Sequence, residues 1–519
     1  MTASRRRRLA AGALTLTAAL VASACSSGSG GEAADTNTLT MMVPLFQTAP
    51  DPKGEIHQAV EKLIGKKLQI TWVPNADYNE KTNITLASAS LPDVMVIQDN
   101  KGASFVKAAK AGAFWDLTDK LDKYPNLKPK SQQVWMNSKT DGRNYGIYRV
   151  RPLLRSAVIL RKDWLEKLDL ELPKTTDDLY EIAKAFTEKD PDGNGKKDTY
   201  GLILPKWPAP VFSASSPYNA IDVWFGTPNN YGVRDGKLVP EFDVPEFWEA
   251  QKYTKKFIDE GLVNPDWATL DTGKWNDPFL QGKGGIIIDV NVRAGELFDK
   301  FKELDPETYD QKVAMAGNLT RPDGQKFSLP FTGFNGIVAI SKQRVQTEEQ
   351  LDDVLTTLDK LASKEGSILV NNGIEGRNFK AENGFAVKID EEDPAIKVIN
   401  NDVQFGFIQL GMTSSVGVAG EAYEWMRPSQ AEQEWLKQRD ELMELDLQTA
   451  VHDPSLPVIS QTAVDQGPTL NPIPTDARIK YLAGDLSEEQ FKAEIKRWYD
   501  SGGTQILTEL QAGISKVGG

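Results

Sequence analysis

The sequence predicts an α/β protein with material for two lobes, because strand-like apolar runs alternate with amphipathic helical segments. A β-type run over 38–43 is followed by a helical pattern over 53–65 and a second strand over 68–73. A helix over 79–89 then leads to Val94–Ile97, whose continuous apolar side chains suit a buried parallel strand. These elements predict the first α/β lobe.

Two further stretches of strands and helices complete the material for two lobes. The expected strands are 156–160, 201–204, 285–289 and 334–341, and the expected helices are 163–168, 175–189, 348–363 and 487–498. With 519 residues the chain is long enough for about two to three domains. The expected division is 38–150 with 328–420 for one lobe and 151–327 with 421–519 for the other.

Composition excludes several classes of protein. The chain has 60 basic and 73 acidic residues, a formal net charge of −13, and this excess of acid repels the phosphate backbone of nucleic acids. Its two histidines and one cysteine cannot form a His-rich or thiolate zinc site, a CxxC redox pair or an intrachain disulfide. We therefore expect no nucleic-acid partner and little of the usual catalytic chemistry.

The N-terminus has the pattern of a secretory signal peptide over 1–24. Arg5 to Arg8 precede an apolar stretch and the small residues Ala22-Ser23-Ala24, and about 13 apolar positions are too few for the roughly 20 that span a bilayer. Cys25 then begins a Ser/Gly-rich segment, 25–37, that suits a flexible tether. We expect Cys25 to be the lipidated first residue of the mature protein, anchored to the outer face of the cell membrane. The alternative is an ordinary small residue at a cleavage site, and the choice between the general and the twin-arginine export route stays open.

An acidic loop follows the helix expected over 175–189. It places oxygen-bearing side chains at alternate positions and a glycine at the sixth, which is the pattern by which one short loop surrounds a hard cation, and calcium fits best. The expected ligands are Asp190, Asp192, Asn194, Lys196 through its carbonyl, and Asp198. Gly201 stands where an EF-hand has a bidentate glutamate. The alternative is an acidic turn without metal, and in either case the role is structural rather than catalytic.

Ligand-contacting residues are expected at the carboxyl ends of strands and among tryptophans in turn-rich segments. In open α/β sheets ligands bind outside the carboxyl ends of the strands, and a flat indole suits a sugar face. The candidates are Gln98, Asp99, Trp207, Trp224, Trp275, Asp289 and Asn291. For each tryptophan, packing in the core is the competing explanation.

Several blocks of sequence resemble a known family. They are 87–93, 124–127, 161–168, 173–176, 190–201 and 502–509. These blocks resemble the family 1 extracellular solute-binding lipoproteins of ABC importers, closest to the branch with oligosaccharide-binding and alginate-binding members. The resemblance implies a periplasmic-binding-protein-like fold of two α/β lobes with a hinge and a ligand cleft between them. It also implies delivery of the ligand to membrane permease subunits and calcium in the acidic loop, although Thr199 replaces an acidic residue of the alginate-binding members.

Taken together, the sequence predicts a monomeric, lipid-anchored binding protein that captures a carbohydrate, an oligosaccharide, for import and catalyses nothing. The alternative is a secreted, lipid-anchored carbohydrate-active enzyme, a lyase or hydrolase, since paired carboxylates cannot be recognised from sequence. A Ser104-to-Lys107 SxxK pattern lacks the companion motifs of penicillin-recognising enzymes and is set aside. A lipoprotein that presents solutes to a sensor is a third possibility with the same fold.

Overall fold

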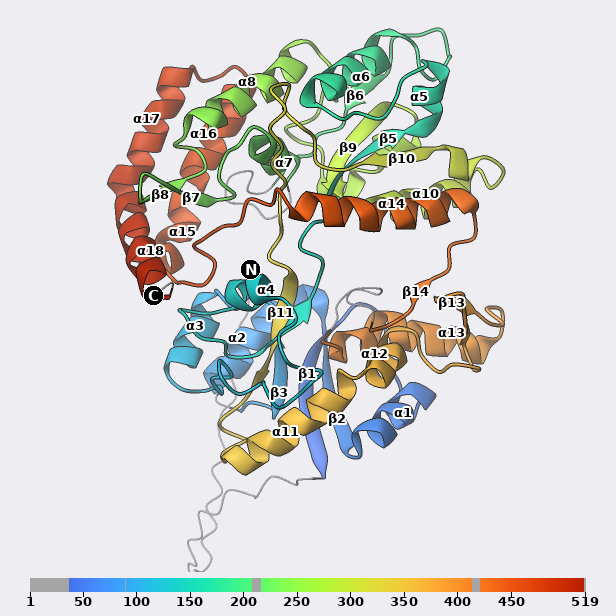
Figure 1. Cartoon of the computed structure of the whole chain (residues 1–519), viewed down its shortest axis with the longest axis vertical. Coiled ribbons are helices and arrows are strands. Elements are labelled where there is room, and N and C mark those ends of the chain that lie inside the picture. Colours follow the sequence, from blue (N-terminus) through green and yellow to red (C-terminus); the bar gives the residue numbers. More distant parts are fainter. Residues whose placement is uncertain (1–36, 89, 208–215, 413–420, 518–519) are drawn as a thin grey trace, which may run out of the picture. The chain divides into compact units, whose positions relative to one another are not determined.

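The computed structural model describes residues 37–88, 90–207, 216–412 and 421–517, which form two α/β lobes (Figure 1). The expected signal peptide, the start of the tether and Cys25 lie outside the described residues. Each lobe has its own sheet and its own buried apolar core. The α/β class predicted from the alternating pattern is confirmed.

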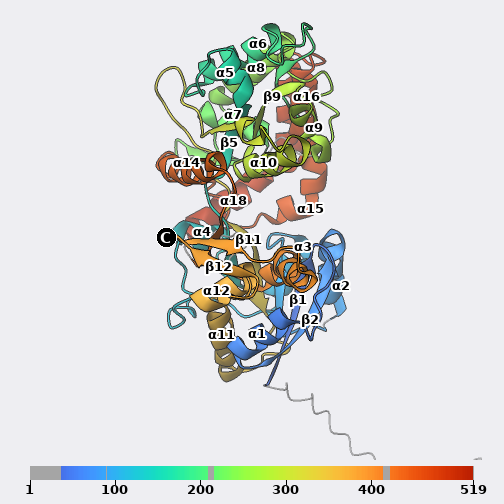
Figure 2. The ribbon, with the colours of Figure 1, turned by 90° about the vertical axis from the view of Figure 1, so that its right-hand side faces the viewer.

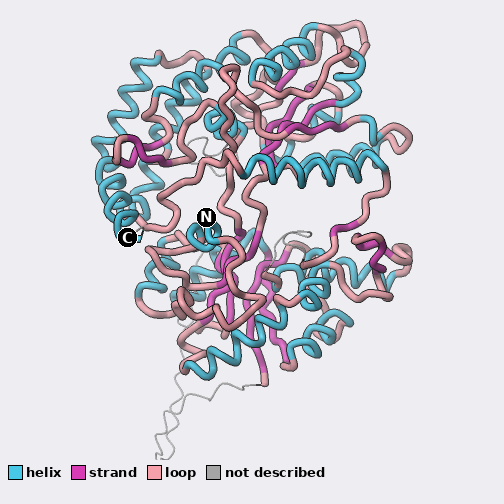
Figure 3. The backbone as a smooth tube through the Cα atoms, viewed as in Figure 1, coloured by secondary structure: helices cyan, strands magenta, loops and turns pink. Residues whose placement is uncertain are grey.

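The sheet of the first lobe has five strands in the order β2-β1-β3-β11-β4. Its strands are the magenta group in the lower half of Figure 3. Their bounds are β1 Thr38–Leu45, β2 Lys67–Pro74, β3 Val94–Ile97, β4 Ile147–Val150 and β11 Phe334–Ile340. β1 is parallel to β2 and β3, whereas β11 is antiparallel to β3 and to β4. All four side chains of β3 are buried, as expected for a central strand covered on both faces.

Helices cover both faces of this sheet and bury its apolar side chains. α1 (Glu55–Ile64) packs against α11 (Glu348–Leu361), and the two views show these helices side by side (Figures 1 and 2). The other helices are α2 Tyr78–Ser88, α3 Ala103–Lys110, α4 Gln132–Asn137, α12 Lys364–Asn371 and α13 Pro394–Asn401. The first lobe also carries a small three-stranded sheet. Its strands are β12 Phe379–Glu382, β13 Phe385–Lys388 and β14 Glu424–Trp425.

The sheet of the second lobe has four strands in the order β10-β5-β9-β6. Their bounds are β5 Ser156–Arg161, β6 Tyr200–Leu202, β9 Gly284–Val290 and β10 Val313–Ala316. β5 is antiparallel to β9 and β10, and β6 is parallel to β9. The expected strands over 156–160, 201–204 and 285–289 are thus present.

The second lobe is rich in helices. They are α5 Lys162–Lys167, α6 Thr176–Glu188, α7 Pro217–Trp224, α8 Pro245–Asp259, α9 Asp277–Leu280, α10 Val292–Leu304, α14 Gln430–Leu447, α15 Gln461–Leu470, α16 Pro472–Leu482, α17 Glu488–Trp498 and α18 Thr504–Val517, with a hairpin of β7 Tyr231–Arg234 and β8 Lys237–Pro240. Capping boxes at Thr175 and Ser487 start α6 and α17, the helices expected over 175–189 and 487–498. Of the described helices, none combines the length and the apolar character that crossing a bilayer requires.

Glu509 on α18 ties the C-terminal helices together. Its carboxylate accepts hydrogen bonds from the hydroxyl of Ser460 (2.7 Å), the amide of Gln505 (2.9 Å), and the N–H and hydroxyl of Thr462 (2.9 and 2.8 Å). Partial burial by itself raises the pKa of Glu509, but these hydrogen bonds outweigh it and lower the pKa to about 2. The ionised carboxylate therefore stabilises the fold.

We expect Glu509→Gln to lower the free energy of unfolding at pH 7 by about 1–2 kcal/mol, allowing for solvent screening. Because the folded pKa lies below the ordinary glutamate value of 4.5, the stabilisation is present above that pH and declines as pH falls toward 2. The variant should consequently differ less from wild type at pH 3 than at pH 7 in urea unfolding. Glu434→Gln, an exposed change on α14, is the control. An equal difference at both pH values would contradict this prediction.

Candidate ligand-binding site

Two segments of chain, 151–155 and 329–333, connect the two lobes and pair with each other. We call this pair the connecting ribbon. Its backbone contacts are the hydrogen bonds from Arg151 N–H to the Gly333 carbonyl (2.9 Å) and from Phe331 N–H to the Leu153 carbonyl (2.7 Å), and a bridge between Leu154 and Pro330. The ribbon therefore runs from one sheet to the other as a hydrogen-bonded unit.

The ribbon joins the edges of both sheets at which parallel strands have their carboxyl ends. In the first sheet β4 ends at Val150 opposite Phe334, the first residue of β11, on the edge where parallel β1 and β3 also end. In the second sheet Ser156 pairs with Val290, the last residue of β9. Because ligands of α/β sheets bind at carboxyl ends of strands, the ribbon marks the expected site.

Gln98 and Asp99 lie at the carboxyl end of β3, as predicted. The side-chain amide of Gln98 donates to Oδ1 of Asn75 (2.9 Å), and the exposed Asp99 accepts from the N–H of Lys101 (3.0 Å). Phe46, directly after β1 on the same edge, is 50% exposed although it is a large aromatic residue. Phe46 was not among the predicted residues, although an aromatic side chain three residues after the predicted strand 38–43 was a usable signal.

Asp289 and Asn291 lie at the carboxyl end of β9 and next to the ribbon. Arg293 donates from Nε to Asp289 (2.5 Å), and burial raises the pKa of Asp289 although Arg293 and Arg155 oppose that rise. The N–H of Asn291 donates to the carbonyl of Arg155 (2.6 Å). The structure thus brings these two predicted residues together, while within its described part no hydrogen bond links them to Gln98 or Asp99.

Trp224 and Trp275 are core residues, which corrects their predicted role in ligand contact. Both side chains are fully buried. The indole N–H of Trp224 donates to Oδ1 of Asn318 (2.9 Å) and that of Trp275 to the carbonyl of Ile203 (3.0 Å). Because the rings are enclosed and their polar groups are satisfied within the protein, they offer no face to a sugar. Trp207 is half-buried and meets Trp275 edge to face at 5.9 Å.

The acidic loop brings together its predicted residues. Asp190 accepts from the N–H groups of Asn194 (3.1 Å) and Gly195 (3.0 Å), and the Asn194 side-chain amide donates to Asp192 (2.6 Å) and Asp198 (3.0 Å). Lys196 donates its N–H to Oδ1 of Asn194 (2.8 Å). Asp190, Gly193 and Gly195 have positive φ, which lets the chain curl around a centre.

The electrostatics of this loop depend on Lys283. Its ammonium pairs with Asp198 (2.6 Å), and this contact together with the Asn194 amide lowers the pKa of Asp198. In the described residues no three carboxylate, imidazole or thiol side chains are arranged as a metal site. A turn of the Asn194 amide by 180° would place its oxygen, instead of its nitrogen, between the two carboxylates. The donor chemistry then fits a hard cation.

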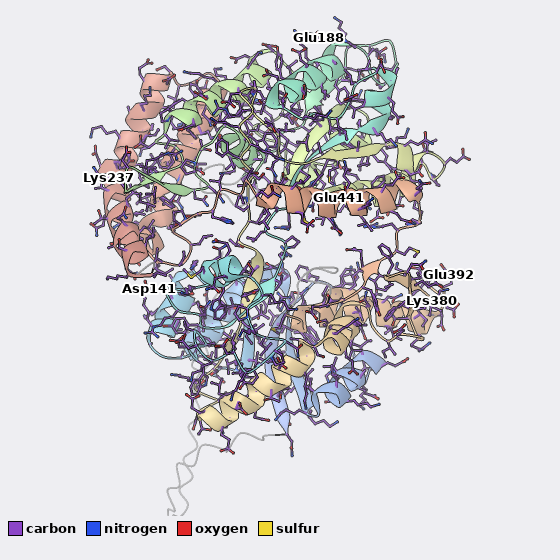
Figure 4. All side chains as sticks on the ribbon, in the orientation of Figure 1. Asp141, Glu188, Lys237, Lys380, Glu392 and Glu441 are labelled. Carbon is purple, nitrogen blue, oxygen red and sulfur yellow. The ribbon has the colours of Figure 1, made fainter. Side chains whose placement is uncertain are left out.

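The loop is far from the ribbon. It lies at the surface, directly after α6, whose last residue, Glu188, points outward (Figure 4). It enters β6 at Tyr200, which pairs with Gly284 at the amino end of β9, six residues before Val290. Six residues of strand span about 20 Å. A cation there would brace the junction of α6 and β6 without touching a ligand at the ribbon.

Comparison with known proteins identifies the family. The model of the bacterial extracellular solute-binding proteins matches residues 51–302. Lipoprotein LipO of Bacillus subtilis (strain 168) is 37% identical over 500 residues, which cover 96% of this chain and 96% of that protein. The chain belongs to the bacterial extracellular solute-binding proteins.

Two further kinds of relative bear on this solute-binding protein. The polygalacturonan/rhamnogalacturonan-binding protein YtcQ of Bacillus subtilis (strain 168) is 33% identical over 484 residues, covering 92% of this chain and 91% of that protein. A solved extracellular solute-binding protein from Bifidobacterium longum subsp. infantis superimposes with a TM-score of 0.71 at 19% identity, over 92% of this chain and 98% of that one.

A second solved structure bears on the acidic loop. It is an EF-hand mutant of the Streptococcus pneumoniae substrate-binding protein FusA with fructo-nystose, and it superimposes with a TM-score of 0.61 at 20% identity, over 92% and 99% of the two chains. Both superpositions confirm the two-lobed solute-binding fold. The description of the FusA structure also places an EF-hand in a protein of this fold.

We expect Trp275→Ala to lower the free energy of unfolding by about 3–5 kcal/mol, because it removes a fully buried indole. Trp207→Ala should cost less, since that ring is half-buried. Urea unfolding monitored by circular dichroism measures both. If Trp275→Ala kept wild-type stability but lost ligand affinity, the assignment of this residue to the core would be wrong.

Proposed function

We propose that this solute-binding protein captures an oligosaccharide outside the cell and delivers it to the permease subunits of an ABC importer. The observation that carries the proposal is the connecting ribbon, which joins the carboxyl edges of two separate sheets in a chain that belongs to this family. Two of the relatives reported above are described with carbohydrates, one as a polygalacturonan/rhamnogalacturonan-binding protein and one in complex with fructo-nystose. The ligand is held and released unchanged.

The two lobes close around the ligand by bending at the ribbon. The buried apolar cluster of the first lobe draws on residues 39–148 and 337–412, and the clusters of the second draw on 157–329 and 435–510. This distribution is consistent with the division 38–150 with 328–420 and 151–327 with 421–519, with two exceptions: Leu329 packs in the second core, and β14 pairs with β13 beside the first lobe. The ligand favours closure because it contacts both lobes only in that state.

The protein works as a monomer on the outer face of the cell membrane. Its anchor is Cys25, lipidated after removal of residues 1–24, and residues 25–37 form the tether. A relative described as a lipoprotein matches 96% of this chain, which supports the anchor. A single lipid chain binds membranes only weakly, so we expect the lipoprotein type of modification, with more than one chain.

Calcium binds the acidic loop and stabilises the second lobe. Asp190, Asp192, Asp198 and Asn194 supply side-chain oxygens and Lys196 its carbonyl. At Gly201 a Cβ atom would lie 2.5 Å from the Cα of Ala183, so a ligating glutamate has no room there. The loop thus offers five oxygen donors, and one of them, Asp198, is already paired with Lys283. We therefore infer a weak calcium site in which water completes the coordination.

Oligosaccharide binding without turnover is the direct test. We expect the purified mature protein to be stabilised by one class in a panel of di- to tetrasaccharides, with Tm rising by several degrees at saturation because the ligand binds only the folded state. Mass spectrometry after prolonged incubation should recover the sugar intact. Shortened or unsaturated products would favour the rival assignment as a lyase or hydrolase, and no stabilisation by any sugar would refute the proposed ligand class.

Removing calcium should affect stability and leave ligand binding unchanged. We expect Ca²⁺ to raise the Tm of the wild type and EGTA to reverse that rise, whereas Asp192→Asn should respond little to either, because it removes one charged donor. Sugar affinity measured by calorimetry should stay within about threefold in all states, because the loop is about 20 Å from the ribbon. Asp485→Asn, an exposed change between α16 and α17, is the control. Loss of sugar binding on chelation at unchanged Tm would contradict this structural role.

A further inference from the structure

Besides the connecting ribbon, a second set of contacts joins the two lobes. Lys101 lies in the first lobe, in the loop between β3 and α3, and its Nζ donates to two carbonyls, that of Lys139 in the same lobe and that of Leu456 in the second lobe. The N–H of Gly142 in the first lobe donates to the carbonyl of Pro457 in the second (2.8 Å). We call these contacts the clasp. One side chain and one backbone amide thus reach from the first lobe to the second.

The two surfaces of the clasp approach each other closely. Pro457 and Val458 are buried although they belong to a loop, and Val458 packs in the core of the second lobe. Gly142 has a φ of +82°, and a Cβ atom there would lie 3.1 Å from Cγ2 of Val517 on α18. Glycine suits this position because it allows both the left-handed backbone and the close approach of the helix. The clasp is therefore a packed contact as well as a hydrogen-bonded one.

The first-lobe side of the clasp is held rigid by buried polar side chains. The side-chain amide of Asn100 donates to the carbonyl of Ser138 (2.8 Å) and to Oγ1 of Thr140 (3.3 Å), and that hydroxyl donates to the carbonyl of Asn100 (2.9 Å). Asn100 and Thr140 are 4% and 1% exposed. The loop that is fixed in this way also carries Gln98 and Asp99 at the carboxyl end of β3. These two predicted ligand residues are thus held in place relative to the clasp.

The second-lobe side of the clasp is tied to the connecting ribbon. Asp453 accepts from the N–H (2.8 Å) and the hydroxyl (2.7 Å) of Ser455, and from the side-chain amide of Asn230 (3.3 Å). The neighbouring Asn229 donates from its side-chain amide to the carbonyl of Pro330 in the ribbon (3.1 Å). Because the clasp and the ribbon are attached to the same hydrogen-bonded stretch of the second lobe, they keep their positions relative to each other.

The amine of Lys101 is enclosed at the clasp. Burial lowers the pKa of Lys101 to about 7, although the nearby Asp453, Asp99 and Asp141 favour its charged form. A neutral amine still has two N–H groups, one for each carbonyl, so the contacts are available in both protonation states. A carbonyl that is buried against the amine loses its donor when the lobes part, and this loss opposes their separation at the clasp.

We propose that Lys101 is a positioning residue whose clasp acts as a second, non-covalent pivot beside the ribbon and keeps Gln98 and Asp99 in register with the second lobe. An additional point of attachment lets the lobes rotate about the line through the clasp and the ribbon, and it opposes twisting and sliding. A ligand then meets fewer arrangements of the two lobes, so less freedom is lost when it binds. This inference adds to the proposed closing motion, and its test needs no ligand.

Hydrogen exchange measures the clasp directly, because the N–H of Gly142 is bound across the lobes. By mass spectrometry of unliganded protein, we expect this amide to exchange about tenfold faster in Lys101→Met than in wild type. Lys101→Arg keeps donors for the carbonyls and should lie between the two. Lys107→Met, an exposed change on α3, is the control and should match wild type. Equal exchange in wild type and Lys101→Met would overturn the inference.

The arrangement of the lobes is measured in the same variants by electron resonance between two spin labels. Glu441→Cys on α14 and Glu392→Cys before α13 place the labels toward the side of the molecule away from Asp141, which lies beside the clasp (Figure 4). Cys25→Ser removes the one natural cysteine. We expect the distribution of label distances to be about twofold wider in Lys101→Met than in wild type, because more arrangements become populated.

The width of this distribution distinguishes a positioning role from a local structural one. Faster exchange at Gly142 with an unchanged width would overturn the inference, because Lys101 would then support only its own loop. If Lys101→Met does not fold, wild type decides. Its Gly142 amide should exchange at least about tenfold more slowly than in an unfolded peptide, and an unprotected amide would overturn the inference. None of these measurements contains a sugar, so failure of the clasp and failure of oligosaccharide capture are distinguishable.

Discussion

The paired backbone of the connecting ribbon is the constraint on which the functional geometry depends. Hydrogen bonds between its two segments fix the carboxyl edge of the first sheet to the carboxyl end of β9. The N–H of Val150 also donates to the carbonyl of Met412 (2.8 Å), which packs in the core of the first lobe. A loop connection would leave each edge free to turn independently. A ribbon allows bending but keeps side chains on its two segments, such as Arg155 and Phe331, in contact.

Local patterns predicted local structure well. The four apolar residues Val94–Ile97 form β3 within the predicted bounds, and the acidic loop 190–198 brings its oxygen-bearing side chains together as its spacing indicates. Both depend on residues that are neighbours in sequence. The edge strand β4, Ile147–Val150, was missed because Arg149 interrupts its apolar pattern. The buried guanidinium of Arg149 donates hydrogen bonds to the carbonyls of Gly411 and Asn335 and to the side chain of Gln409. No local sequence pattern reveals these contacts.

The site itself was predicted only in part, for the same reason. Asp289 and Asn291 could be placed because the carboxyl end of a strand is readable from sequence. Trp224 was misassigned because its enclosure depends on Asn318, 94 residues further along the chain. The position of Arg155 likewise depends on Phe331, which reaches it from the other segment of the ribbon. Long-range pairing creates such sites.

The distance between the acidic loop and the ribbon follows from the register of β6 and β9. The loop enters the sheet opposite Gly284, whereas Asp289 and Asn291 stand at the other end of β9. The strand between them is rigid, because its side chains over 284–289 are buried and both neighbouring strands are hydrogen-bonded to it. A cation in the loop would therefore stabilise the second lobe and leave the proposed choice of ligand to residues at the ribbon. Stability and specificity can then change independently, since a substitution at one end of β9 does not alter the packing at the other.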